Sequence, residues 1–496
     1  MDYYYDDYYD EYYDQSELAG AARSLHREIG FDETVSNCVH PSLRFSAQYV
    51  TNFIAVNFLF SLLVLVVRRI FNASQKWLHL LCCLCGIVLL YRVIDHGFYH
   101  FVQLAVTLHM VQWTLHRWFP ASNRYIKTPF IVIAYGIGNL LVSELLEPSA
   151  ETWNRIRGTQ MILLMKALSL AFDTDGNLAL RNQLNVLSYC GYVLCPANVI
   201  LGPWISFSDY LNIWKPASGL ESKHGQPSSG RRILIHAFRI LISALMAIGF
   251  LLTSNCMIDY LLAPIGSWKW VRAYGRALSF RTSHYFIAYL SQCSMLAAAV
   301  DWNRSNDERS IMLPVNSLYR VTSPTAVEFP RSLVQVVTAW NIPMHLWLKR
   351  YIFRTTKRPF GTAAAIALTY IISSLLHGLH YRLWVTLLTI GSWTFVEHEI
   401  RRKIAAIYSA CVLVGKCPDS CAVHQHKNKS LLCIVINVLF FALNTFNLIY
   451  LGCIFETTEG PPEEVHHDKS IFGRWTELNY ASHWLLVFAY IFYFLI

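Results

Sequence analysis

The sequence predicts an all-α protein that crosses a membrane many times, and three observations carry this prediction. Of its 496 residues, 54% are hydrophobic and only 15% are charged, whereas soluble domains carry about 25% charged residues. Apolar runs near the length of a bilayer crossing recur from residue 50 to the last residue. Lysines and arginines gather in short clusters beside these runs, as in loops that face anionic headgroups. The net charge of +9 therefore indicates membrane orientation, and we expect no nucleic-acid partner.

The apolar runs predict about eleven transmembrane or re-entrant helices. They lie at residues 50–67, 78–94, 96–113, 129–146, 184–203, 233–253, 284–300, 362–377, 383–397, 431–452 and 482–496. A further run at 154–173 holds Lys166 in its apolar face, and we expect an interfacial or half-inserted helix there. Residues 1–45, rich in tyrosine and aspartate, are expected to form a mobile acidic tail, and residues 46–496 one membrane domain.

Charges in the loops predict the orientation of the chain. The basic loops at 68–76, 223–232 and 401–429 should face the cytosol, and the acidic loop at 456–468 should face the lumen. Most of the 13 cysteines should pack as small hydrophobic residues. A disulfide is expected only for a lumenal pair that involves Cys38 or Cys453.

One apolar segment is interrupted by residues that do not suit a continuous helix. The sequence FPRSLVQVVTAWNIPMHLWLKRYIF, residues 329–353, contains Trp340, Asn341 and Pro343. Proline breaks helical hydrogen bonding, and broken backbone at membrane depth occurs where it is buried in protein or lines a wet cavity. We therefore expect Asn341 to face a cavity.

A histidine stands at the end of another apolar run, in LTYIISSLLHGLHY, residues 368–381. His377 costs free energy in hydrocarbon unless it has a partner. A histidine of near-neutral pKa can take a proton from an alcohol that attacks an acyl carbonyl, and an amide such as Asn341 can orient it. Gly378 would allow a substrate to approach closely, and His380 would lie one turn away as a supporting residue. The candidates for substrate contact near this site are Trp340, Ser374 and His380.

Two other roles are open for this histidine. It could be a core residue bonded to a neighbouring helix. It could also activate Ser373 or Ser374, which precede it by about one turn on the same helical face, although such serines more often bond their own backbone.

The segments WNIPMHLW and SSLLHG together resemble the membrane-bound O-acyltransferase family, whose signature positions are an Asn or Asp and a histidine. These positions fall on Asn341 and His377. Further segments resemble the Wnt-acylating members of that family, from about residue 90 to the end of the chain. They are RGTQMILLMKALSLAFD, GPWISF, FPRSLVQVVTAWNIPM and WTELNYASHW.

The resemblance implies an endoplasmic-reticulum membrane enzyme that transfers palmitoleate from palmitoleoyl-CoA to a serine hydroxyl of a Wnt protein. It implies a central acyl tunnel, His377 as general base, Asn341 as the orienting residue, and no required cofactor. The phosphorylated head of coenzyme A needs cations. Lys349, Arg350 and Arg354 are candidates for this contact, although each could equally serve only to orient the chain in the membrane.

Four soft ligands also lie within the sequence CPDSCAVHQH. Cys417, Cys421, His424 and His426 could hold a structural zinc ion, since a site with four protein ligands is closed to substrate. Acylation of one of the cysteines, or no special role, are the alternatives.

Two other functions remain open at this level. A membrane-bound O-acyltransferase could act on a lipid or sterol hydroxyl rather than on a protein. A transporter could use His377, His380 and Lys166 as a polar pathway, although the hydropathy pattern shows no convincing internal repeat.

Overall fold

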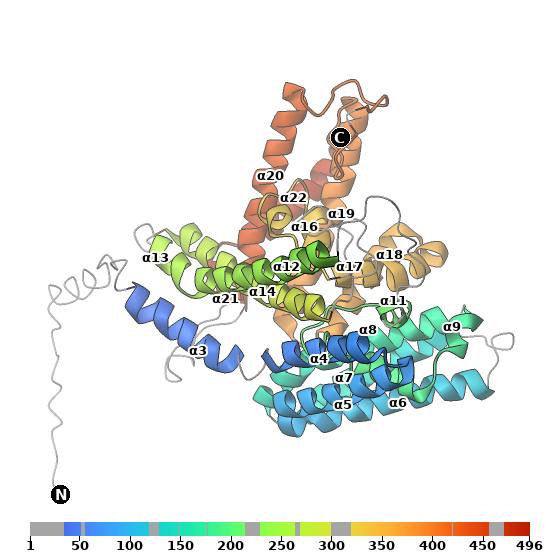
Figure 1. Ribbon diagram of the computed structural model, residues 1–496. Helices are drawn as coiled ribbons and strands as arrows, with labels where there is room; N and C mark the ends of the chain where they lie inside the picture. The colour runs from blue at the N-terminus through green and yellow to red at the C-terminus, as the bar shows by residue number, and fades with distance from the viewer. Residues whose placement is uncertain are drawn as a thin grey trace, which may run out of the picture.

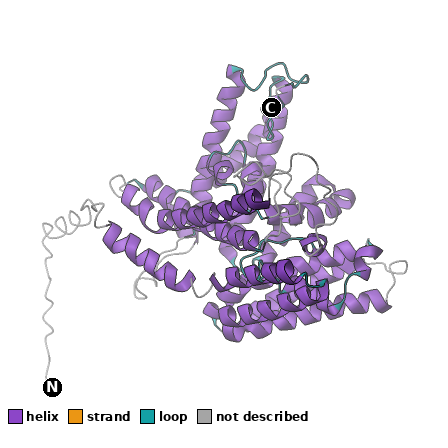
Figure 2. Cartoon of the chain, viewed as in Figure 1, coloured by secondary structure: helices purple, strands orange, loops and turns teal. Residues whose placement is uncertain are grey.

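The computed structural model describes residues 34–50, 55–118, 128–147, 149–175, 177–213, 229–262, 268–298, 319–418, 420–455 and 471–496. Within these ranges the chain is helical apart from turns and loops, and its one isolated β-bridge joins Ala410 to His426. Figure 2 shows this all-helical character. The acidic loop at 456–468 lies outside the described residues.

Most helices of the first half of the chain pack closely together in one group. Figure 1 shows α4 to α9 gathered together, with α12 beyond them. The elements are η1 (Val35–Val39), α3 (His40–Val50), α4 (Val56–Phe71), α5 (Gln75–Ile94), η3 (Asp95–Gly97), α6 (Phe98–Trp118), α7 (Thr128–Leu146), α8 (Ala150–Asp175), α9 (Leu178–Asn182), α10 (Val186–Val193), α11 (Phe207–Ile213) and α12 (Ser229–Leu252).

The second half contains the interrupted segments and the longest helices. Figure 1 shows α19, α20 and α22 extending away from the first group of helices. The elements are η5 (Thr253–Met257), α13 (Ile258–Leu262), α14 (Lys269–Ala297), α15 (Pro324–Glu328), α16 (Leu333–Trp340), α17 (Ile342–Trp347), η7 (Leu348–Phe353), α18 (Arg354–Leu376), α19 (Tyr381–Ile407), α20 (Leu431–Gly452), α21 (Ile471–Glu477) and α22 (Ala481–Leu495).

Five described helical stretches are long and apolar enough to cross a bilayer. They are Gln75–Ile94, Thr128–Leu146, Ile233–Met257, Ile342–Leu376 and Leu431–Gly452. Two shorter apolar helices, Val56–Arg68 and Ala481–Leu495, accompany them. The predicted all-α membrane architecture is confirmed, and the number of about eleven crossings stays a prediction.

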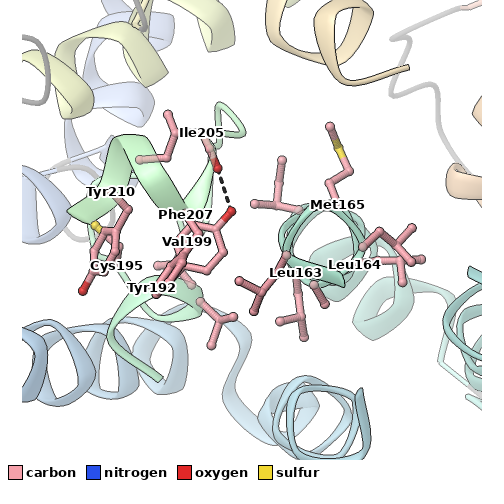
Figure 3. Close-up of a cluster of buried hydrophobic side chains, with 14 of the residues drawn as sticks. Leu163, Leu164, Met165, Tyr192, Cys195, Val199, Ile205, Phe207 and Tyr210 are labelled. Atoms are coloured by element: carbon pink, nitrogen blue, oxygen red, sulfur yellow. Dashed lines mark hydrogen bonds between the residues drawn. The ribbon is translucent and has the colours of Figure 1, made fainter. Parts of the chain in front are cut away.

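The predicted span at 184–203 is wrong. Only α10 is helical there, and the chain then turns at Leu194 and runs irregularly to α11. Pro196 and Pro203 lie within this apolar run and cannot continue a helix. The irregular stretch packs on α8, and the Tyr192 hydroxyl donates to the Ile205 carbonyl at 2.7 Å, as Figure 3 shows.

The interfacial helix predicted at 154–173 is instead the buried helix α8. Leu163, Leu164 and Met165 are at most 2% exposed (Figure 3), and the Lys166 side chain is fully buried. Its Nζ donates to the carbonyls of Tyr192 (3.0 Å) and Val193 (3.3 Å) and to Asn198 Oδ1 (2.8 Å). All three donors of the ammonium group are thus used, and the charge lies at the negative end of α10.

Part of the segment predicted as the amino-terminal tail is helical in the structure. Residues from Val35 to Val50 are helical, and Cys38 forms a disulfide with Cys256 of η5. A helix and a covalent bond thus connect residues 35–45 to the rest of the chain, and the domain boundary at residue 45 stays a prediction. Residues 1–33 lie outside the described residues. Cys453 is a free, buried cysteine.

The disulfide lies near one end of α20, and the loop that precedes α20 lies at the other end. Ser254, close to Cys256, bonds Ser279 of α14, while Gly452 at the end of α20 packs against Ala277. The 22 residues of α20 span about 33 Å, which is close to the thickness of the hydrocarbon core. The disulfide and the loop at 408–430 therefore lie at opposite ends of α20, one of the candidate spans.

We predict that Lys166→Met lowers the thermal unfolding temperature of the purified protein. The substitution keeps the side-chain volume but leaves the carbonyls of Tyr192 and Val193 unpaired, and each buried unpaired group costs about 1–3 kcal/mol. Scanning fluorimetry in detergent measures the change, with exposed Lys76→Met as the matched control. An unfolding temperature equal to that of the wild type would show that these carbonyls find other partners.

Candidate active site

The helix is broken at Asn341, as the sequence predicts. α16 ends at Trp340 and α17 begins at Ile342, with extended backbone at Asn341 (φ −140°, ψ 90°) between them. The Asn341 Oδ1 accepts a hydrogen bond from the Met344 N–H at 3.1 Å and so caps α17, while Pro343 occupies the first turn. A new helix can therefore start directly after the old one stops.

The residues before α15 satisfy the backbone groups that this break releases. The Ala339 carbonyl accepts from the Ser323 N–H and the Thr322 hydroxyl, both at 3.0 Å. The Ile342 N–H donates to the Val321 carbonyl at 2.8 Å. The break is thus half-buried, and its backbone groups are paired within the protein, as irregular backbone at membrane depth requires.

A histidine that the sequence analysis did not single out covers the break from α14. The rings of His284 and Trp340 stack with centroids 4.1 Å apart and planes 6° apart. His284 Nε2 lies 2.9 Å from the Trp340 carbonyl oxygen, so the hydrogen bond requires the tautomer with a proton on Nε2. A histidine within an apolar run was the available signal, as it was for His377.

His377 stands at the tight turn between α18 and α19. Its N–H donates to the Ser374 carbonyl, and the N–H of Gly378 donates to the Leu375 carbonyl, both at 3.0 Å. The Leu379 N–H donates to Glu144 Oε2 of α7 at 2.5 Å, and Trp384 Nε1 donates to the Gly378 carbonyl at 2.6 Å. Two neighbouring helices therefore fix the turn that carries His377.

A protein carboxylate makes the close approach to Gly378 that was expected of a substrate. Gly378 has φ +76°, and a Cβ added there would lie 2.4 Å from Glu144 Oε2. The guanidinium of Arg157 in α8 interacts electrostatically with both Glu144 and His377. The sequence analysis did not single out Glu144. The feature that could have revealed it is a charged residue within the apolar run at 129–146.

The hydroxyl of Ser374 is not paired with His377. It donates to the Tyr370 carbonyl at 2.9 Å, which is the backbone bond expected of a serine in an apolar helix. His380 is the residue directly before α19 and makes no capping hydrogen bond with its side chain, and its Nδ1 is buried with no hydrogen-bond partner among the described residues. Nor does a hydrogen bond join Asn341 to His377 in the described part of the chain. The predicted acyl tunnel stays a prediction.

The three candidate cations for coenzyme A share one short segment after α17. Lys349 and Arg354 are exposed. Arg350, 53% exposed, pairs with Asp173 Oδ1 of α8 at 2.9 Å, and the neighbouring Tyr351 hydroxyl donates to Asp173 Oδ2 at 2.9 Å. Arg350 therefore forms an ion pair with α8, while Lys349 and Arg354 are exposed and available to bind phosphates.

The structure regroups the four predicted metal ligands. Cys417, Cys421 and His424 lie together with Cys411, which the sequence analysis did not include. His426 is exposed and stands outside this group.

Comparison with known proteins identifies the class of enzyme. The model of the membrane-bound O-acyltransferase family matches residues 75–408, a range that contains both the break at Asn341 and the turn at His377. The chain belongs to this family. It is therefore an acyltransferase rather than a transporter.

Named relatives extend the similarity beyond the family region. The chain is 79% identical over 496 residues to the protein-serine O-palmitoleoyltransferase porcupine of Anopheles gambiae, covering 100% of both chains. It is 34% identical to the Homo sapiens protein of the same name, over 85% of this chain and 94% of the human one. Lysophospholipid acyltransferase 2 of Arabidopsis thaliana is 24% identical, over 51% of this chain and 59% of its own.

We predict that Gly378→Ala lowers the rate of acyl transfer at least about tenfold. A left-handed conformation costs a residue with a Cβ about 1–2 kcal/mol, and the new methyl group would also collide with Glu144. A displacement that costs about 1.4 kcal/mol in the transition state already slows a reaction tenfold. Initial rates of acyl transfer by the purified protein measure the effect.

Gly361→Ala is the matched control for this substitution. Gly361 also has a positive φ of 81°, but an added Cβ would meet no atom within 4 Å. It should lower stability without a comparable loss of rate. Equal rates for Gly378→Ala and the wild type would contradict the tight fit between Gly378 and Glu144.

Proposed function

We propose that this chain transfers palmitoleate from palmitoleoyl-CoA to a serine hydroxyl of Wnt proteins at the endoplasmic-reticulum membrane. The observation that carries the proposal is the 79% identity, over the full length of both chains, to a protein named for its palmitoleoyl group and serine acceptor. The Wnt acceptor and the organelle rest on the resemblance to the Wnt-acylating members of the family.

His377 is the proposed general base. It takes the proton of the serine hydroxyl as the serine oxygen attacks the thioester carbonyl of palmitoleoyl-CoA. A new ester bond between carbon and oxygen forms, the bond between carbon and sulfur breaks, and the proton passes to the coenzyme A thiolate. The hydrogen bond from Leu379 to Glu144 supports this role, because it holds the histidine's turn in one position.

Asn341 is the proposed orienting residue. Its Oδ1 caps α17, which leaves the amide nitrogen as the group that can donate to the thioester carbonyl or to the histidine ring. The parallel stacking of the Trp340 and His284 rings supports this role, since it limits the movement of the backbone directly before Asn341.

The positions of the cysteines support access from two sides. Disulfides persist in the lumen and are rare in the cytosol, so the side that holds the bond between Cys38 and Cys256 is the proposed lumenal side, where a secreted acceptor would enter. The free cysteines of the loop at 408–430 lie at the other end of α20, which is the proposed cytosolic side, where coenzyme A is available.

A lipid or sterol hydroxyl is the alternative acceptor. The similarity to a lysophospholipid acyltransferase favours this alternative. That similarity covers only 51% of the chain, and the identity is far lower than to the protein-serine acyltransferase of Anopheles gambiae.

We predict that His377→Ala abolishes transfer while the protein still accumulates and remains monodisperse. Loss of a general base costs about 10²–10⁴-fold in rate, and Asn341→Ala should reduce the rate less. The assay is transfer of labelled palmitoleate from coenzyme A to a Wnt hairpin peptide by the purified protein.

Two controls separate chemistry from folding. His398→Ala changes an exposed histidine of α19 and should leave the rate unchanged. Asn341→Ser keeps a side-chain oxygen that can cap α17 but removes the amide, so a rate as low as that of Asn341→Ala assigns the loss to the amide. A His377→Ala protein that fails to accumulate would instead favour a structural histidine. A folded wild type that binds acyl-CoA but acylates only a lysolipid or sterol would replace the acceptor.

We predict that the double substitution of Lys349→Gln and Arg354→Gln raises the KM for palmitoleoyl-CoA several-fold and leaves kcat nearly unchanged. The reason is that cations bind the phosphates of the head group equally in the ground state and the transition state. Initial rates over a range of acyl-CoA concentrations measure both constants. Arg402→Gln, an exposed arginine paired with Glu399, is the control, and an equal rise in its KM would attribute the effect to general surface charge.

A further inference from the structure

The loop between α19 and α20 brings four metal-binding side chains to one point. The sulfurs of Cys411, Cys417 and Cys421 and one ring nitrogen of His424 all lie within 4.8 Å of one another. Cys411 and Cys417 are buried, and the other two side chains are half-buried. Figure 1 shows this loop at the far end of α19 and α20.

The distances within this cluster are those of ligands around a tetrahedral metal. His424 Nδ1 lies 3.7 Å from the sulfur of Cys411, 3.7 Å from that of Cys417 and 3.4 Å from that of Cys421. One imidazole nitrogen carries either one proton or one lone pair, so it cannot form three hydrogen bonds to thiols. Bonds of about 2.3 Å from zinc to sulfur and about 2.0 Å from zinc to nitrogen place each sulfur about 3.5 Å from the nitrogen.

We propose that Cys411, Cys417, Cys421 and His424 form a closed structural zinc site. Three sulfurs and one imidazole suit zinc in tetrahedral geometry, and four protein ligands leave no position for substrate. A disulfide among three cysteines would leave one thiol unpaired. The cluster also lies at the other end of α20 from the disulfide of Cys38, on the side proposed to be cytosolic, and a reducing compartment keeps thiols available as ligands.

The fold of the loop explains why Cys411 replaces His426 as a ligand. The Cys411 N–H donates to the His426 carbonyl, and the His426 N–H donates to the Ser409 carbonyl, both at 2.9 Å. This pairing fixes the two segments side by side. It turns the His426 ring to solvent and the Cys411 sulfur into the cluster, which spacing along the sequence does not reveal.

The loop needs such a site because it has little core of its own. Residues 408–430 form no helix, and their buried contacts form a small group with the ends of α19 and α20. The buried members are Ala405, Ala410, Cys411, Val412, Cys417 and Cys433. A structural zinc ion contributes folding free energy where a hydrophobic core is too small to do so.

The zinc site would brace the helix that leads to Asn341. Arg331 donates to the carbonyls of Cys411 (2.9 Å) and Leu413 (3.1 Å), and the Ser332 hydroxyl donates to the Val414 carbonyl at 3.3 Å. α16 begins at the next residue, Leu333, and ends beside Asn341. This consequence rests on the proposed function, whereas the metal site itself does not.

The test is the metal content of the full-length protein, purified in detergent without chelators. Mass spectrometry of the metals should find about one zinc per chain, and X-ray absorption should show about three sulfurs and one nitrogen around it. Cys411→Ser should lose the zinc, while the control His426→Ala should keep it. These readouts do not depend on acyl transfer, so they stand apart from the proposed function.

Three results would overturn the proposal. They are wild-type protein that is folded but holds no zinc, a His426→Ala variant that loses zinc while Cys411→Ser keeps it, and an acyl group on one of the three cysteines of the metal-free protein. If Cys411→Ser does not accumulate, Cys417→His keeps four ligands, and the proposal then requires that this variant retain zinc.

Discussion

Every backbone polar group at membrane depth must find a partner inside the protein, and this requirement shapes each irregular point of the chain. At the end of α10, the ammonium group of Lys166 donates hydrogen bonds to the last backbone carbonyls. The break between α16 and α17 is satisfied by the segment around Val321. The turn after α18 is satisfied by Glu144. The last two of these points carry Asn341 and His377, so the candidate active site lies where helices stop and side chains from other helices replace the missing bonds.

A buried ion pair connects the helices and the loop that support the segment before Asn341. Arg401 and Glu397 of α19 form a bond of 2.7 Å with at most 1% of either side chain exposed. Glu397 also accepts from the Leu333 N–H at the start of α16 and from Asn444 of α20, while Arg401 donates to the Val412 carbonyl. Because burying two charges is costly unless every bond is made, this pair allows very few alternative arrangements of α16, α19 and the cysteine-rich loop.

The sequence predicted the fold class and the two irregular points well, because these depend on composition and on single residues. Pro343 marks the break at Asn341. Gly378 was expected to allow close approach of a substrate, and instead it takes the positive φ of the turn after His377, beside Glu144. The apolar run at 184–203 was wrongly predicted to be one helix, because the prediction relied on its length and ignored its two prolines. The partners of these points could not be predicted in the same way. Glu144 lies 235 positions from the N–H group that it holds, and hydropathy alone does not show which helices meet. Cys411 was missed because a backbone pairing, rather than spacing, brings it to the cluster.

The opposite placement of the disulfide and the cysteine cluster has a practical consequence for handling this protein outside the cell. In the proposed orientation, each group meets only its own compartment in the cell. Once the protein is in detergent, one buffer reaches both sides of the molecule. A strong thiol reductant would protect the sulfurs of Cys411, Cys417 and Cys421 but open the bond between Cys38 and Cys256, while an oxidising buffer would do the reverse. A sample reconstituted into sealed vesicles, with different redox buffers inside and outside, would keep both groups in their native states.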